Sequence, residues 1–252
     1  MSTAAIEKAA VPGMRRGALW TLPGVIALLL AAVFAYVGSL ELDSISVRAL
    51  APQAVLAAVW EHVLLVAAST LLTIVVGVPL GVMLTRPRFA APGAAVLAVA
   101  NAGQAVPSIG ILVILAMLFG VGFWMAVVAL VAYALLPVLR NTMVGIRQVD
   151  PALLDAGRGM GMGSREVLFT IELPLAVPVM LAGIRVALIL NVGAATLAAF
   201  TNAGGLGSII SSGIALNRMP VLIVGSALTI ALALAVDWVA GIAERSLRPR
   251  GI

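Results

Sequence analysis

The chain has 252 residues, of which 63% are apolar and only 10% are charged, and its mean hydropathy is +1.19. Ordinary soluble domains contain about 45 to 50% apolar and about 25% charged residues, so the composition excludes a soluble protein. Cysteine is absent and histidine occurs once, which excludes disulfides, thiolate nucleophiles and most metal sites. The net charge of +5 comes from Lys and Arg that are dispersed between apolar stretches, so no nucleic-acid-binding face is expected.

Long uncharged stretches predict helices that cross a bilayer, because about 20 apolar residues span a hydrocarbon core of roughly 30 Å. Their continuous apolar character argues against a transmembrane β-barrel, whose segments alternate. The sequence therefore predicts an all-α polytopic membrane protein with about six transmembrane helices, one N-terminal helix and a five-helix core. The predicted spans are Leu19–Val37, Val63–Thr85, Ala94–Phe119, Phe123–Leu139, Val177–Phe200 and Val221–Ile242.

The segment 1–50 is expected to hold a cytoplasmic tail, the first span and a short outside segment. The first apolar run is longer than the core of a usual signal peptide, so an uncleaved anchor is expected. The segment 51–252 is expected to form one transmembrane domain.

The distribution of cations predicts the orientation in the membrane. With a cytoplasmic amino terminus, twelve Lys and Arg residues fall inside and only Arg48 and Arg218 fall outside. Both termini are then cytoplasmic. The twelve inside cations are Lys8, Arg15, Arg16, Arg86, Arg88, Arg140, Arg147, Arg158, Arg165, Arg245, Arg248 and Arg250.

The inside stretch 140–177 is the largest polar insertion between spans. Asp150 before Pro151 predicts the start of a short helix, since a carboxylate caps it and the proline fixes its first turn. Glycines at 159, 161 and 163 are expected to end this helix. Ser164 is expected to cap a second short helix, and Pro174 is expected to stop that helix before the membrane.

This stretch carries a motif whose spacing resembles the EAA loop of permease subunits in ATP-binding-cassette importers. Asp155 stands where that family usually has glutamate, and Gly157 stands where it usually has alanine, so both are conservative departures. The matching positions are Asp155, Ala156, Gly157, Gly161, Ile171, Leu173 and Pro174.

The resemblance implies that the loop is a coupling helix that binds a cytosolic ATPase. It also implies a second permease chain, either a copy or a paralogue, and an extracytoplasmic solute-binding protein. The permease would lie in the bacterial cytoplasmic membrane, with no catalytic residue, no metal and no cofactor of its own, because ATP and Mg²⁺ would be used by the partner ATPase.

Other segments are similar to the branch of this family that imports glycine betaine, choline, carnitine and related osmoprotectants. They lie in the first core helix, in the next two helices and in the outside loop between the last two helices. The residues that carry this similarity are His62, Pro79, Leu80, Gly81, Thr85, Arg86, Asn101, Gln104, Val106, Pro107, Ser108, Tyr133 to Pro137, Arg140, Asn141 and Gly204 to Gly207.

Polar residues within the spans are candidates for the solute pathway. Asn101, Gln104 and Ser108 recur at helical spacing, so they are expected to share one face, either lining the pathway or bonding across a helix interface. Pro107 is expected to kink that helix. Asn191 is a further pathway candidate, and Gly204, Gly205 and Gly207 form either a plain turn or an outside gate.

Two charged residues fall inside spans, where an ionised side chain is costly unless it pairs. Arg185 and Asp237 lie at similar depths in the last two spans, so they are expected either to form an ion pair or to reach cytoplasmic water separately. His62 is expected to have an interfacial or packing role near the outside end of its span.

Three alternatives stay open to different degrees. An intramembrane enzyme would need a catalytic constellation, which the single histidine and the absence of cysteine do not supply. A permease for another small solute, such as an amino acid, or a secondary transporter built on broken helices are the stronger alternatives.

Overall fold

The computed structural model describes residues 18–247, and this part of the chain is helical and contains no strand. Five helical segments within it are long and apolar enough to cross a membrane, which confirms an all-α polytopic membrane protein. They are α1 (Ala18–Gly38), α3 (Pro52–Leu84), α6 (Phe123–Arg147), the segment Ser164–Thr201 that contains α9 (Leu173–Ala195), and α11 (Met219–Leu247).

The predicted span Ala94–Phe119 is not one helix. It consists of α4 (Ala90–Ala105) and α5 (Ser108–Phe119), which are bent by 100° relative to each other. Pro107 lacks an N–H and disfavours helical backbone at the residue before it, and Val106 accordingly has an extended ψ of 133°. The prediction of a continuous, merely kinked helix is therefore wrong, and up to six spans result if this broken pair counts as one.

The core of the bundle lies where α3, α6 and α9 pack together. Leu65, Leu130 and Val192, one from each helix, belong to the same buried apolar cluster. α6 and α9 approach closely at Gly183, where an added Cβ would lie 2.7 Å from the carbonyl oxygen of Pro137. Small residues allow such close approach between membrane helices, which gain little from hydrophobic burial in lipid.

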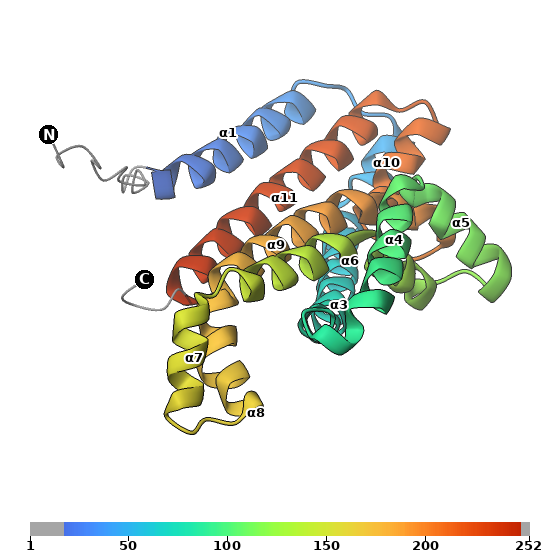
Figure 1. Cartoon of the computed structure of the whole chain (residues 1–252). Coiled ribbons are helices and arrows are strands. Elements are labelled where there is room, and N and C mark those ends of the chain that lie inside the picture. Colours follow the sequence, from blue (N-terminus) through green and yellow to red (C-terminus); the bar gives the residue numbers. More distant parts are fainter. Residues whose placement is uncertain (1–17, 248–252) are drawn as a thin grey trace, which may run out of the picture.

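α1 lies at the edge of the molecule beside α11 (Figure 1). None of the residues in its membrane-spanning window is buried. Trp20 and Phe34 are both 76% exposed, as expected for side chains that contact lipid rather than water. The cations Lys8, Arg15, Arg16, Arg248 and Arg250 lie outside the described residues.

Short elements connect the spans: α2 (Ser44–Ala49), η1 (Pro87–Phe89), η3 (Thr196–Thr201) and α10 (Leu206–Ala215). Asp43 caps α2 by accepting a hydrogen bond from the Ser46 N–H at 3.0 Å. Hydrogen bonding to Ser46 is the main cause that holds the pKa of the Asp43 carboxyl below its usual value, with a smaller contribution from Arg218.

Two short helices project beyond the bundle at one end (Figure 1). They are α7 (Pro151–Gly159) and α8 (Ser164–Val167). The predicted cap of the first is confirmed, because the Asp150 carboxylate accepts a hydrogen bond from the Ala152 N–H at 2.8 Å. The predicted cap of the second is wrong: Gly163 occupies the N-cap position, and Ser164 is already inside the helix without a capping hydrogen bond.

Pro174 does not stop the second helix. A π turn, η2 (Leu168–Glu172), connects α8 directly to α9, so the chain is helical from Ser164 into the membrane span. The Leu173 N–H donates to the Leu168 carbonyl in this wider turn. A π turn relieves the clash that a proline ring makes with the preceding turn of a regular α-helix, which is why the prediction of a break at Pro174 is wrong.

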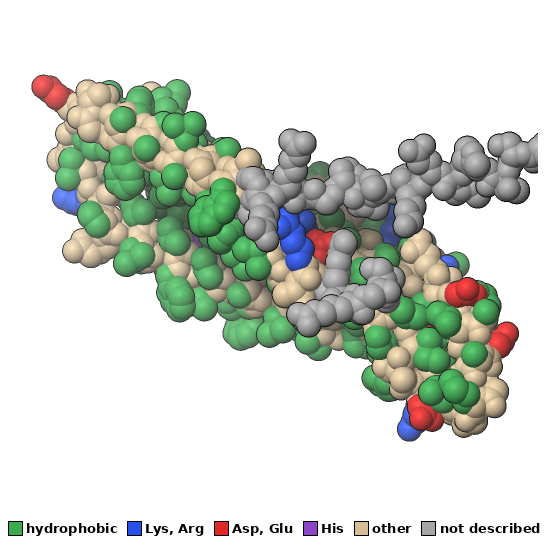
Figure 2. Space-filling model, turned by 90° about the vertical axis from the view of Figure 1, so that its left-hand side faces the viewer, with side chains coloured by type: hydrophobic (Ala, Val, Ile, Leu, Met, Phe, Trp, Pro, Cys, Tyr) green, Lys and Arg blue, Asp and Glu red, His purple; other side chains and the backbone are tan. Residues whose placement is uncertain are grey.

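Hydrophobic side chains cover most of the flank seen in Figure 2, whereas acidic and basic side chains gather at the lower tip that α7 and α8 form. Large apolar side chains such as Leu56, at 70% exposure, stand on the surface between the two ends. An exposed apolar belt of this kind is incompatible with water and fits a lipid environment.

Candidate functional site

The projecting pair α7 and α8 holds the residues of the EAA-like motif. Asp155 and Ala156 lie on the exposed side of α7, where Asp155 forms an exposed ion pair with Arg158 at 3.2 Å. Gly161 has a φ of +91°, a conformation that glycine adopts readily and other residues rarely adopt. The glycine of the motif therefore forms the tight connection between the two helices.

Gly157 is the buried member of the motif. A Cβ at this position would lie 2.7 Å from the Cδ1 atom of Ile171, another motif residue. Ile171 thus fills the space that the family's usual alanine methyl would occupy. This contact explains how glycine is accommodated at this position, and it joins the first half of the motif to the second.

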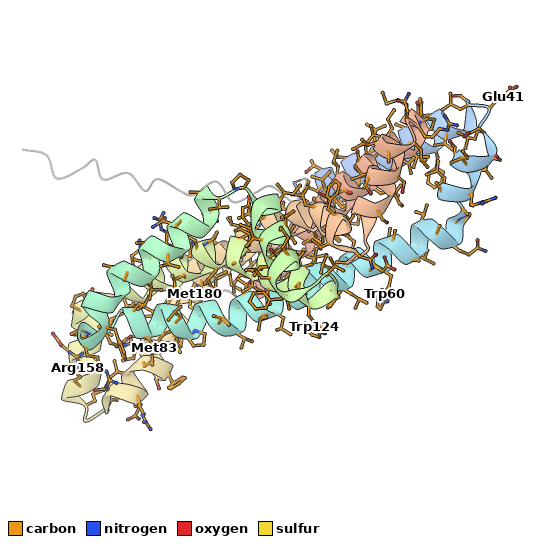
Figure 3. The ribbon with its side chains drawn as sticks, turned by 90° about the vertical axis from the view of Figure 1, so that its right-hand side faces the viewer. Glu41, Trp60, Met83, Trp124, Arg158 and Met180 are labelled. Carbon is orange, nitrogen blue, oxygen red and sulfur yellow. The ribbon has the colours of Figure 1, made fainter. Side chains whose placement is uncertain are left out.

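The projection also exposes apolar side chains that no described residue covers. Met160 is 71% exposed, Phe169 is 68% exposed and Leu153 is 47% exposed. Figure 3 places Arg158 of this projection and Glu41 at opposite ends of the molecule. A protruding apolar surface surrounded by charged residues is typical of a site that binds another protein.

The sequence assigned no role and no partner to one charged residue at the base of the projection. Glu172 lies within the motif, is buried, and forms an ion pair with Arg86, which follows the end of α3. The two residues are 86 positions apart in the sequence. The only sequence signal for the pair is that Glu172 is a charged residue inside an otherwise apolar segment.

The polar face that was predicted on the span Ala94–Phe119 is interrupted by the break at Pro107. Asn101 and Gln104 lie on α4, whereas Ser108 begins α5 and points along a different axis, so the three do not share a single helix face. The Asn101 Oδ1 accepts a hydrogen bond from Arg140 at 2.7 Å, and the Gln104 Nε2 donates to the carbonyl of Tyr133 at 3.2 Å. Both bonds tie α4 to α6.

An open hollow of about 330 Å³ lies beside the broken helix. Ser108, Tyr133, Gly193 and Thr196 are among the residues that line it. Asn191 does not line this hollow, because its side chain is fully buried and donates to the Thr70 hydroxyl at 3.0 Å.

The glycine loop before α10 is held by two side chains of α3. The Glu61 carboxylate accepts a hydrogen bond from the Gly205 N–H at 2.9 Å. The fully buried His62 accepts at Nδ1 from the Leu206 N–H at 3.3 Å, and its Nε2 lies 3.0 Å from the carbonyl oxygen of Val192. The ring is neutral and protonated at Nε2 in this arrangement, because Val192 offers only an acceptor.

His62 therefore bonds to both α9 and the start of α10, which is a more specific role than the interfacial or packing role that the sequence indicated. The loop is also tightly packed, since a Cβ at Gly207 would lie 1.8 Å from the carbonyl oxygen of Thr196. The three predicted glycines thus lie together at one site, at the end of the bundle opposite α7 and α8 (Figure 1).

The structure brings Arg185 and Asp237 together across α9 and α11. The Arg185 Nε donates to Asp237 Oδ1 at 2.5 Å, and Nη2 donates to Oδ2 at 2.8 Å. A third contact joins Arg185 Nη1 to Glu244 Oε2 at 3.4 Å. Gly241 lies beside the guanidinium, where an added Cβ would make an ordinary van der Waals contact at 3.5 Å.

Exchanging these charges tests whether the pair stabilises the bundle. Arg185→Asp or Asp237→Arg alone is expected to reduce folded protein, because each change leaves like charges facing each other and removes charge-assisted hydrogen bonds that contribute about 1.5 to 3 kcal/mol. The double exchange is expected to recover folded protein in a detergent size-exclusion assay. Recovery no better than that of either single change would contradict a stabilising pair.

The chain is similar to known membrane transport proteins. The family model described as binding-protein-dependent transport system inner membrane component matches residues 77–249. A choline transport system permease protein of Bacillus subtilis (OpuBB) is 42% identical over 193 residues, which cover 77% of this chain and 88% of the relative. An osmoprotectant import permease protein of Salmonella typhimurium (OsmW) is 37% identical and covers 77% and 91% of the two chains.

Solved structures share the fold. An inward-facing structure of the MetNI methionine ABC transporter aligns with a TM-score of 0.68 at 24% identity and covers 77% of this chain and 96% of that chain. An amino acid ABC transporter structure with histidines aligns with a TM-score of 0.66 at 17% identity, covering 82% and 100%. At such identities these structures indicate a common architecture and nothing about the solute.

Proposed function

Because the chain belongs to the family of binding-protein-dependent transport system inner membrane components, we propose that it forms the pathway for choline, glycine betaine, carnitine or a related quaternary amine. The chain is a permease subunit of an ATP-binding-cassette importer, located in the bacterial inner membrane. One observation supports this choice of solute: relatives named for these solutes are about 40% identical over three quarters of the chain.

The α7–α8 projection is proposed as the surface that binds the ATPase. Three features support this role: the EAA-like spacing, the exposed apolar residues Leu153, Met160 and Phe169, and the position at one end of the bundle. The ATPase would bind and hydrolyse ATP with Mg²⁺, and movement of the projection would change the arrangement of the spans as rigid bodies.

The positive-inside rule places the projection in the cytoplasm, because it carries Arg158 and Arg165 and lies at the same end as Arg86 and Arg147. Both termini are then cytoplasmic. The loop held by Glu61 and His62 lies at the opposite, extracytoplasmic end, where a solute-binding protein would deliver the solute.

The hollow beside Ser108 is proposed as part of the solute pathway, with a second permease chain closing it. A broken helix at the site supports this role, since irregular backbone within a membrane occurs where it lines a cavity or is buried by protein. Selectivity for a quaternary ammonium group would lie mainly in aromatic rings of the binding protein, because this chain contains only 5% aromatic residues.

An uptake experiment tests the solute class. Proteoliposomes that contain the permease with its ATPase and binding protein are expected to accumulate radiolabelled choline, glycine betaine or carnitine only when ATP is enclosed on the ATPase side. Uptake of an amino acid instead would contradict the proposed solute. Uptake by the permease without the ATPase would instead favour a secondary transporter.

A further inference from the structure

A partly buried ion pair joins Arg86, which follows the cytoplasmic end of α3, to the base of the projection. Arg86 Nη1 donates to Glu172 Oε1 at 3.0 Å, and Arg86 Nη2 donates to Glu172 Oε2. The Glu172 side chain is only 4% exposed and that of Arg86 is 33% exposed. Two parallel hydrogen bonds between a guanidinium and a carboxylate fix direction as well as distance, so the pair holds the two segments in one orientation.

The π turn places Glu172 for this contact. One additional residue in a helical turn rotates the following side chains by about 100° relative to a regular helix. Val167, before the turn, is buried beside Gly157 of α7, and the half-buried Ile171, within the turn, lies beside the same glycine. Glu172, at the end of the turn, faces α3 instead. Two neighbouring residues of the π turn, Ile171 and Glu172, thus contact two different segments, α7 and the end of α3.

The opposite end of α3 is bonded to α9 and to the loop that follows it. His62 lies 22 residues before Leu84, which corresponds to about 33 Å of helix. Its Nε2–H donates to the Val192 carbonyl, one of the last-turn carbonyls of α9 that have no partner within that helix. Its Nδ1 and the neighbouring Glu61 hold the N–H groups of Leu206 and Gly205.

We propose that these contacts clamp α3 to α9 at both ends, so that displacement of the α7–α8 projection moves the extracytoplasmic glycine loop. Arg86, Glu172 and His62 are positioning residues for the coupling of ATP hydrolysis to transport, and they contact neither ATP nor solute. This inference rests on the proposed ATPase-binding role of the projection. If the contacts at either end were broken, α9 would tilt relative to α3. ATP hydrolysis would then proceed without moving the glycine loop.

The ratio of solute transported to ATP hydrolysed tests the clamp in proteoliposomes containing the permease, the ATPase and the binding protein. Glu172→Gln is expected to leave ATP hydrolysis within about twofold of the native rate and to lower the ratio at least tenfold. His62→Asn keeps an acceptor for Leu206 but removes the donor to Val192, and it is expected to lower the ratio similarly. Arg86→Glu with Glu172→Arg is expected to restore most of the ratio.

Arg88→Gln is the matched control, because it removes an exposed positive charge two residues from Arg86 and leaves the ion pair intact. It is expected to keep the native ratio. Should Glu172→Gln fail to fold, Arg86→Lys keeps the charge but loses the paired hydrogen bonds, and it is expected to lower the ratio partially.

Two results would overturn the clamp: hydrolysis and transport that fall in equal proportion in folded variants, or a ratio unchanged in both Glu172→Gln and His62→Asn. If the native chain and these variants all couple ATP hydrolysis to transport normally, the clamp is overturned and the proposed function stands. A native chain that supports no ATP-dependent uptake overturns the proposed function and the clamp with it.

Discussion

Replacing Phe169 by glutamate is expected to abolish binding of the ATPase while the permease stays folded. Phe169 is 68% exposed on the projection, so the change removes little internal packing of the described chain. Burying a new carboxylate in an apolar interface would cost at least about 2 kcal/mol, which is roughly a 30-fold loss of affinity. The measurement is the amount of ATPase that copurifies with the tagged permease in mild detergent, together with its hydrolysis rate.

Leu216→Glu provides the control for this experiment. Leu216 is 49% exposed and follows α10 at the opposite end of the bundle, so the same chemical change there is expected to leave the ATPase bound. Equal retention of the ATPase by both variants would contradict the assignment of the projection. Loss of the ATPase from both would point to a general effect of added charge.

Gly207→Ala is expected to cause the largest loss of folded protein among single methyl additions in the described bundle. The new Cβ would lie 1.8 Å from the carbonyl oxygen of Thr196 and 2.6 Å from its carbonyl carbon. These are backbone atoms, which cannot move aside as the end of a side chain can, so the cost is expected to reach or exceed about 3 kcal/mol. Thermal unfolding in detergent and the yield of monodisperse protein measure the effect.

Gly193→Ala is the comparison, because apart from its chain neighbours and the nearby backbone of its own helix no atom lies within 4 Å of the Cβ that it would add in α9. It is expected to keep or slightly raise the melting temperature, since alanine favours a helix over glycine by about 1 kcal/mol. Similar melting temperatures for the two variants would show that the loop before α10 is not closely packed against η3.

The sequence predicted the class of fold because lipid imposes a simple rule on it. Every backbone group within the membrane must be bonded, so long apolar stretches form helices whatever their order. Capping by Asp150 was also predictable, because a cap depends only on residues two or three positions apart. The contact between Arg185 and Asp237 was one of the two arrangements that the sequence left open, since two costly charges at similar depth gain by pairing.

Contacts between distant segments could not be predicted in the same way. Pro107 and Pro174 both lie within helical stretches, yet the helix ends at Pro107 and continues through Pro174. The difference depends on neighbouring segments: a π turn precedes Pro174, and Glu172 at the end of that turn pairs with Arg86, which follows α3. The residues around each proline do not indicate whether the helix breaks or continues there.

The role of His62 was underestimated for a related reason. The sequence places His62 near the end of a span, and the residues around it do not indicate its bonding partners. Its two bonds go to the carbonyl of Val192 and the N–H of Leu206, which are backbone groups more than 100 residues away. Only the assembled bundle brings them together.

Photocrosslinking in intact cells tests the central claim most directly, namely that the α7–α8 projection contacts an ATP-binding-cassette ATPase. A photoreactive phenylalanine analogue is placed at Phe169 in one variant and at Trp60 in a control variant. Trp60 is 62% exposed on α3 and lies away from Arg158 in Figure 3. The account predicts an ATPase adduct, identified by mass spectrometry, from position 169 and none from position 60. The absence of an ATPase adduct at 169, or equal adducts at both positions, would contradict it.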